Sequence, residues 1–215
     1  MQPPTRLASP PRGRRRRRAH ANRNVDTTAA TRIDILKSAA KAFRRLGYHG
    51  ATVEQIAAAL HMKKGNLYYY FRSKEEILFA CHQYSLDQLM HLLADVEQRR
   101  VSPSITLHDL IRGAVRTILD ELHGTALFLD LEALSPAHLQ AVIVQRDRFD
   151  RGVRQIIDDG IAAGVFAPGT SKLLSFAILG AINWIPRWFD PNGPASSDEI
   201  ANHFADYLLA GLRRG

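Results

Sequence analysis

The stretch TVEQIAAALHMKKGNLYYYFRSK, residues 52–74, decides the fold of this chain. It predicts two short helices joined by a tight turn, because Thr52 is a good helix cap and apolar residues follow it at helical spacing. The second helix, over residues 64–71, is too short to be stable alone. Leu67 and Phe71 lie on one face and pin it to the first helix. Two helices arranged in this way form a helix-turn-helix, whose second helix enters the major groove of DNA.

The outward face of the second helix carries cations, an amide and phenol hydroxyls, and these groups bind phosphate oxygens and base edges. Consecutive tyrosines on a helix point about 100° apart, so Tyr68, Tyr69 and Tyr70 cannot all lie in a core. We expect Tyr68 and Tyr69 to face DNA. For Tyr70 both positions stay open: it can face DNA or lie in the core. Gly65 would let the start of the helix approach the duplex closely. The predicted DNA contacts are Thr52, Lys63, Lys64, Gly65, Asn66, Tyr68, Tyr69 and Lys74.

The same residues resemble the DNA-binding signature of the TetR family of bacterial transcriptional regulators. One part of the signature is the pattern G-x-L-Y-x-Y-F, which runs here from Gly65 to Phe71. The other is S-K-E-E-I-L, residues 73–78. The resemblance covers residues 27–78 and implies a DNA-binding regulator in which Tyr68 and Lys74 contact the DNA backbone.

The positive charge of the chain is confined to its first third. The formal charge is +8, but residues 1–26 hold eight arginines and one acid, and residues 27–74 hold nine basic residues and two acids. Each of these segments therefore carries +7, whereas residues 75–215, with twelve basic residues and eighteen acids, carry −6. This division indicates a DNA-binding head on an acidic regulatory body.

Three domains are expected along the chain. Residues 1–26 offer little to bury, so we expect a disordered basic arm. Two interpretations of its arginine run stay open: a solvated tail, and an arm that follows the DNA backbone or enters a minor groove. Residues 27–73 form the predicted DNA-binding domain, in which a first helix from residue 27 or 28 ends at Gly47 and supports the helix-turn-helix. Residues 74–215 form the predicted effector-binding and dimerisation body.

The body shows helical periodicity and no strand alternation, so we expect an all-α fold with about nine helices, roughly six of them in the body. The expected body helices span residues 74–100, 104–122, 125–134, 135–163, 171–189 and 197–212. The fifth is apolar nearly all round, and such a helix needs a second surface to bury against. We therefore expect a homodimer in which the last two helices of each chain form a four-helix seam.

Enzyme chemistry finds no support, because the sequence lacks the G-x-S-x-G, glycine-rich phosphate-loop and H-E-x-x-H patterns. No metal or cofactor is expected, and the one cysteine, Cys81, is interpreted as a buried apolar residue. The longest apolar run, residues 173–185, is too short to span a bilayer, which predicts a soluble, cytoplasmic protein. Two classes remain: a repressor released from operator DNA by a small molecule, and an architectural DNA-binding protein without an effector. A cavity between the central helices would favour the repressor.

Residues 180–204 resemble the C-terminal region of TetR-family repressors that respond to acyl-CoA esters, where N-W-x-x-x-W precedes a P-x-G-P turn. The matching residues are Asn183, Trp184, Trp188, Pro191, Gly193 and Pro194. The resemblance implies an acyl-CoA thioester as the effector, with a fatty or steroid-derived acyl group. A free fatty acid, a steroid and a drug-like hydrophobe are the alternatives.

The chemistry of these residues is compatible with such an effector. An indole with a guanidinium beside it can hold an adenine ring and a phosphate, and Phe149 is among the apolar residues that can line an acyl cavity. In the alternative interpretation the tryptophans pack at the dimer seam and the arginines of residues 148–154 pair with neighbouring aspartates. Pro186 would kink the helix and re-aim both indoles. The predicted ligand contacts are Phe128, Arg148, Asn183, Trp184, Arg187 and Trp188.

Overall fold

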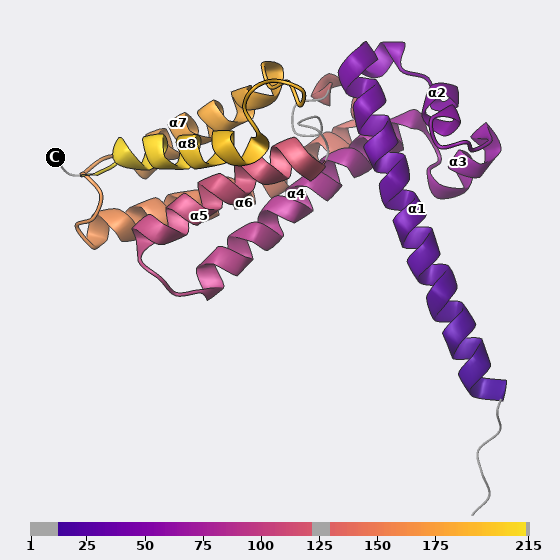
Figure 1. The fold of residues 1–215 in the computed structure, drawn as a ribbon, viewed down its shortest axis with the longest axis horizontal. Coiled ribbons are helices and arrows are strands. Elements are labelled where there is room, and N and C mark those ends of the chain that lie inside the picture. The colour runs from indigo at the N-terminus through magenta and orange to yellow at the C-terminus, as the bar shows by residue number, and fades with distance from the viewer. Residues whose placement is uncertain (1–12, 122–129, 214–215) are drawn as a thin grey trace, which may run out of the picture.

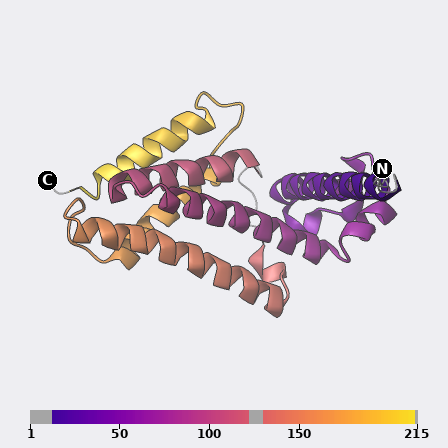
Figure 2. The same ribbon diagram turned by 90° about the horizontal axis from the view of Figure 1, so that it is seen from below.

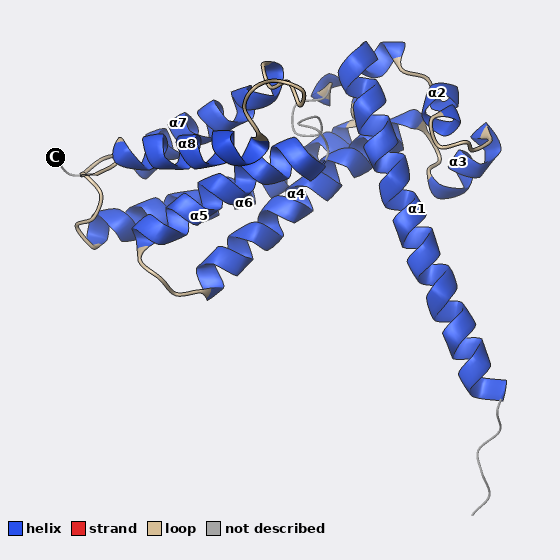
Figure 3. Cartoon of the chain, in the orientation of Figure 1, coloured by secondary structure: helices blue, strands red, loops and turns tan. Residues whose placement is uncertain are grey.

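The computed structural model describes residues 13–121 and 130–213, and the side chains of residues 31–120 and 130–213 (Figure 1). These residues form eight α-helices and three short helical turns with no β-strand among them, which confirms the all-α class (Figure 3). The α-helices are α1 (Gly13–Gly50), α2 (Val53–Ala58), α3 (Lys64–Tyr70), α4 (Lys74–Gln98), α5 (Pro103–Arg116), α6 (Pro136–Ala162), α7 (Ser171–Trp184) and α8 (Ser197–Ala210). A π-helical turn, Thr117–Glu121, extends α5, and 3-10 turns lie at Leu131–Ala133 and Ile185–Arg187.

The first three helices form a small head at one end of the molecule, and α4 to α8 form an elongated body beside it (Figures 1 and 2). α2 packs against α1 and α3, and the side chains of Ile35 and Phe43 in α1 are buried. Gly47 interrupts α1 where the sequence predicted its end, with φ of 70°. Glycine adopts this left-handed conformation without a steric penalty, so it can turn the chain toward α2.

α1 begins at Gly13, well before the predicted start, and projects as a rod beyond the head (Figure 1). The structure therefore differs from the expected disordered arm over residues 13–26, which are helical. Arginine and alanine are good helix formers, and no glycine or proline interrupts the chain between Gly13 and Gly47. Extending an existing helix adds a hydrogen bond per residue without a new nucleus. Residues 1–12 of the expected arm lie outside the described residues.

α4 is shared between the head and the body. Ile77, Leu78 and Cys81 in its first half are fully buried, and the Cys81 thiol lies 3.6 Å from the carbonyl oxygen of Leu36 in α1. The burial of Cys81 confirms its predicted apolar role. Farther along, Leu89 packs inside the body. One continuous hydrophobic cluster therefore runs from the head into the body.

Serine hydroxyls begin four of the five body helices. Each hydroxyl accepts a hydrogen bond from the backbone N–H three residues on, an arrangement that contributes about 1 kcal/mol. The capping residues are Ser73, Ser102, Ser135 and Ser196, at the starts of α4, α5, α6 and α8. A proline follows the caps of α5 and α6, in the first helical turn where its missing N–H costs nothing.

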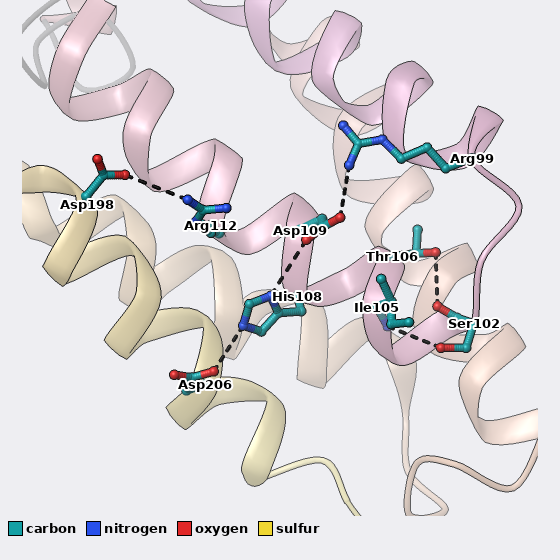
Figure 4. A network of polar contacts seen from close by, with 9 residues as sticks. All are labelled: Arg99, Ser102, Ile105, Thr106, His108, Asp109, Arg112, Asp198 and Asp206. Carbon is teal, nitrogen blue, oxygen red and sulfur yellow. Dashed lines mark hydrogen bonds and ion pairs between the residues drawn. The ribbon is translucent and has the colours of Figure 1, made fainter.

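Within the body, α5 packs along α8 and α6 packs along α7. Polar pairs link α5 to α8 (Figure 4): Nε2 of His108 lies 3.0 Å from Oδ1 of Asp206, and Arg112 lies 3.9 Å from Asp198. These side chains reach solvent, so each pair contributes less than about 1 kcal/mol. The buried apolar residues therefore hold the bundle together.

Two predicted body helices differ in the structure. The helix expected over residues 171–189 ends as α7 at Trp184, because Pro186 has no N–H to continue the ladder, and the chain passes into a 3-10 turn. The helix expected over residues 125–134 is a single 3-10 turn in its described part. The described part of the body thus has five α-helices, and none of the described helices is long and apolar enough to cross a membrane.

Candidate DNA-binding surface and ligand pocket

The turn between α2 and α3 is built by local hydrogen bonds. Thr52 Oγ1 accepts from the N–H of Gln55 at 3.2 Å, and Gln55 Oε1 accepts from the N–H of Thr52 at 3.0 Å, which makes a reciprocal cap. His61 then adopts a left-handed φ of 54°, and the N–H of Met62 donates to the carbonyl of Ala57 at 2.9 Å. These contacts reverse the chain so that α3 can pack on α2.

The outer face of α3 is open, as the sequence predicted. Leu67 and Phe71 are buried against the head, whereas Lys63, Asn66 and Tyr69 are exposed, Tyr69 to 82%. Tyr68 is 42% exposed, and Tyr70 is half-buried with its ring edge-on to Tyr69, 5.3 Å between centroids. A side chain on Gly65 would meet nothing within 4 Å, so this end of α3 offers bare backbone to an approaching duplex.

Lys64 is already paired on this surface. Its Nζ lies 2.5 Å from Oε1 of Glu54 in α2, and both side chains are about half exposed. The hydrogen bond between them raises the pKa of Lys64 and lowers the pKa of Glu54. Exposed pairs of this kind are weak. A phosphate can therefore take the place of Glu54 as the partner of Lys64.

Lys74 is held by the protein itself. Its Nζ donates to the carbonyl oxygens of Tyr48 at 2.8 Å and Ala51 at 2.9 Å, and lies 4.3 Å from the centre of the Tyr48 ring. An ammonium group has three donors, so one remains for a phosphate. In the structure Lys74 thus joins the start of α4 to the last turn of α1 and to Ala51, in addition to its predicted role toward DNA.

Arg32 of α1 is a residue that sequence reasoning missed. Its guanidinium donates to the carbonyl of Tyr70 at 3.1 Å and lies 4.2 Å from the centre of the Phe71 ring. The last carbonyls of a helix have no partner within the helix, so Arg32 fixes the end of α3. Nothing in the sequence pattern joins residues so far apart, and only the fold brings them together.

A pocket of about 330 Å³ opens between α4, α5, α6 and α7, within the size range of small-molecule sites. Most of its wall is apolar: Leu86, Leu89, Ala114, Ile118, Phe149, Phe176, Leu179 and Ile182. Its polar residues lie on α6 and α7: Arg146, Asp147, Asp150 and Asn183. The carboxylate of Asp150 accepts a hydrogen bond from Ser175 Oγ at 2.5 Å and pairs with Arg154. Burial lowers the pKa of the Arg146 guanidinium.

Two family models together match most of the chain. Residues 35–81 match the bacterial regulatory proteins of the tetR family, and residues 101–212 match the tetracyclin repressor-like C-terminal domain. The chain belongs to the TetR family. The head and its exposed α3 are thus the DNA-binding part of a transcriptional regulator, and the protein is a regulator rather than an enzyme.

Several members of the TetR family are similar along most of their length. The HTH-type transcriptional repressor KstR2 of Mycolicibacterium smegmatis is 27% identical over 188 residues, which cover 86% of this chain and 91% of KstR2. The crystal structure of PfmR from Thermus thermophilus is 32% identical and superposes with a TM-score of 0.75, covering 84% of this chain and 99% of PfmR. The crystal structure of AibR in complex with isovaleryl coenzyme A and operator DNA superposes with a TM-score of 0.70 at 24% identity. The match covers 83% of this chain and 96% of AibR.

The pocket of this TetR-family chain contains only some of the predicted ligand contacts. Asn183 lies in its wall, as does Phe149, which was expected to line an acyl cavity. Arg148, Trp184 and Arg187 are exposed and do not line it. Trp188 also lies outside the wall, with its ring stacked on Phe204 of α8 at 6.2 Å, and Phe128 falls outside the described residues.

Arg146, which the sequence analysis passed over, is the arginine that reaches the pocket. The sequence held a signal for it, because Arg146 precedes the inward-facing Phe149 by three residues and so lies on the edge of the apolar face of α6. Arg148 belongs to a series of arginines spaced three apart, and that series is displaced from the apolar face. Arg154 of the series pairs with Asp150, which agrees with the salt-bridged interpretation for that residue.

The outer face of α7 is apolar and exposed, and α8 adds one large exposed aromatic residue. Leu173 and Phe176 of α7 are 66% and 52% exposed, and Tyr207 of α8 is 81% exposed. Exposed apolar patches of this kind are typical of protein–protein interfaces. These are the two helices in which the sequence analysis placed the dimer seam.

Proposed function

We propose that this protein is a homodimeric repressor that binds a palindromic operator and is released from it by a small amphipathic effector. The pocket between α4 and α7 is the observation that carries the proposal. Leu86 and Leu89 of α4 lie in its wall, and the same helix begins at the recognition head. An architectural DNA-binding protein has no need of such a cavity, so the pocket favours the repressor over that alternative.

The link from pocket to DNA is mechanical. A ligand wedged against Leu86 and Leu89 would favour a tilt of α4 that moves the two heads of a dimer away from the spacing of the half-sites. Such a ligand must bind the displaced state more tightly than the DNA-competent state, because only a difference in affinity shifts the equilibrium.

A dimer follows from the limited reach of one recognition helix. α3 has seven residues and reads too few bases for useful specificity, so two copies are needed. We expect Leu173→Glu and Tyr207→Glu to give monomers with poor operator binding, measured by sedimentation and anisotropy. Val144→Glu is the matched control, since Val144 is also an exposed apolar residue, at 54%, but lies on α6. Monomers that keep tight operator binding would contradict the dimer.

An acyl-CoA thioester is the effector we favour. At about 330 Å³ the pocket lies at the lower end of the range for small-molecule sites, so it suits an acyl group rather than a whole coenzyme A ester. Asn183 lies in the wall while its neighbour Trp184 is exposed, so a thioester leaving the pocket there would meet Trp184 and Arg187 on the surface. AibR, a protein of this fold, was solved with isovaleryl coenzyme A and operator DNA. A free fatty acid, a steroid and a drug-like hydrophobe are the alternatives.

Operator release distinguishes these effectors. An operator selected from random DNA with the full chain is titrated with acyl-CoA esters of increasing chain length, their free acids and free coenzyme A. We expect esters alone to release it, with an optimum at the acyl length that fills the pocket. Release by free acids alone would overturn the proposal of a thioester effector. A normal response of the Arg187→Ala, Trp188→Ala double variant would show that the coenzyme A moiety binds at another site.

A further inference from the structure

The head is joined to the body by a contact at the first turn of α6 as well as by the continuous helix α4. Oε1 of Glu75, in the first turn of α4, accepts a hydrogen bond from the N–H of Ser135 at 2.9 Å and lies 2.7 Å from Nδ1 of His138. Phe79, one turn farther along α4, stacks on the His138 ring with 3.8 Å between centroids and 7° between planes. We call these four residues the Glu75 clamp.

The clamp lies beside the recognition head. Lys74, the neighbour of Glu75, donates hydrogen bonds to the carbonyl oxygens of Tyr48 and Ala51, which shortly precede α2 in the sequence. The last turn of α1 also contacts the segment that leads into α6, because the N–H of Tyr48 donates to Oδ2 of Asp130 at 2.5 Å. A displacement at the start of α6 can therefore reach the end of α1, just before the helix-turn-helix, through two short routes: Glu75 with Lys74, and Asp130 with Tyr48.

The charge of Glu75 suits this position. The carboxylate lies in the first turn of α4 and also against the N-terminus of α6, and the positive ends of both helix dipoles favour an anion. Burial raises the pKa of Glu75, but the hydrogen bonds from Ser135 and His138 outweigh it and the net pKa lies below the ordinary value. Glu75 is thus ionised at neutral pH and bonded to α6.

α6 also reaches the ligand pocket. It is one unbroken helix of 27 residues, and Arg146 and Phe149, which lie in the pocket wall, follow His138 by about two to three turns. A helix of this length moves as a rod, so a ligand that shifts Phe149 also shifts the clamp.

We propose that Glu75 is a positioning residue, which sets the angle of the head on the body and thereby makes α6 a second route, beside α4, from the pocket to the recognition helices. The proposal deepens the function proposed above and rests on it for its biological use. The geometry that it assigns to the clamp is a property of the single chain and can be measured without DNA or effector.

The test is a distance distribution between the head and the body. Nitroxide labels are placed at Lys41 on α1 and Ile105 on α5, both exposed, in a Cys81→Ala background, and the labelled chain is diluted into unlabelled protein. The variants are Glu75→Gln and His138→Ala. Glu76→Gln is the matched control. Glu76 is also in the first turn of α4, but it accepts its hydrogen bond from the N–H of Arg72, just before α4, and not from α6.

We expect one narrow distance in the parent and in Glu76→Gln, and a distribution at least twice as broad in Glu75→Gln and His138→Ala, with thermal midpoints that stay close together. An unchanged distribution in both clamp variants would overturn the proposal. A second readout follows the consequence for DNA: the parent should prefer one half-site spacing about tenfold over spacings one base pair away, and Glu75→Gln should lose most of that preference. Failure of every ester to release operator would count against the proposed effector and would leave the distance result standing.

Discussion

The guanidinium of Arg44, on α1 of the head, donates a hydrogen bond to the carbonyl oxygen of Phe189 in the body at 3.2 Å. Phe189 directly follows Trp188 and lies just after the 3-10 turn at Ile185–Arg187. The surface where we place the coenzyme A moiety is therefore next to a direct contact with the DNA-binding head. A ligand bound there can act on α1 without passing through the pocket.

Arg44→Ala should consequently weaken the response to effector more than it weakens the fold. A partly exposed, charge-assisted hydrogen bond contributes about 1 kcal/mol, so the thermal midpoint should fall by only a few degrees. We expect the ester concentration for half-release of operator to change severalfold. Arg45→Ala, which removes the same charge from the neighbouring exposed position, is the control. Equal effects of both variants would show that charge, and not the contact with Phe189, is responsible.

Lys63 and Lys74 should separate DNA contact from fold stability. Lys63 is exposed, so Lys63→Ala should lower the slope of log K against log salt by about 0.9, with no change in thermal midpoint. Lys74→Ala should weaken binding to all sequences alike and also lower the thermal midpoint, because the carbonyls of Tyr48 and Ala51 lose their donor. A Lys74→Ala protein that melts like the parent would mean that these two bonds add nothing to stability.

Arg32 should matter for DNA binding although it is not predicted to touch DNA. Arg32→Ala removes the partner of the Tyr70 carbonyl and the cation over Phe71, which frees the end of α3. We expect operator affinity to fall about tenfold, equivalent to roughly 1.4 kcal/mol. Lys37→Ala on the same helix should have a smaller effect. Nuclear magnetic resonance of the α3 amides would locate the change, and undisturbed α3 signals would point instead to direct phosphate contact by Arg32.

Cys81 should be inert in the native protein. Burial raises the pKa of its thiol to about 12, so at pH 8 almost none of it is thiolate, the reactive form. Alkylation at pH 8 should be slow in the folded protein and fast in denaturant. The unfolded thiol ionises near pH 8.5, so its contribution to stability is complete below that pH and is lost as the pH rises toward 12. Rapid alkylation without denaturant would show that the α1–α4 contact opens readily.

The helix-turn-helix was predictable because its determinants are local. Thr52 caps α2 across three residues, and Leu67 and Phe71 identify the buried face of α3 by their spacing alone. The starts of α4, α6 and α8 were predictable for the same reason, since Ser73, Ser135 and Ser196 lie within one turn of the N–H groups that they bind. The sequence indicated that Pro186 would disturb the helix that contains it. Hydrophobic periodicity could not show whether the proline kinks this helix or ends it, and in the structure α7 ends at Trp184.

The contacts that orient these elements were not predictable. Arg32 and Tyr70 are 38 residues apart, and Lys74 reaches carbonyls 26 and 23 residues earlier. No pattern of hydrophobic spacing encodes such pairs, because they depend on how the helices cross. The arginine in the pocket wall was not predicted for a related reason: Arg148 was chosen from the spacing of the arginines, whereas the apolar face containing Phe149 places Arg146 at the pocket.

The sharing of α4 has a practical consequence for protein engineering. Ile77, Leu78 and Cys81 of α4 are buried where α4 packs against α1. A head fragment cut at residue 73 would lack these three side chains, and the remaining body fragment would expose them to solvent. A chimera that exchanges heads between regulators would therefore need its junction beyond Cys81, in the part of α4 that packs only within the body. Operator choice and effector choice can be recombined here only if the first two turns of α4 travel with the head.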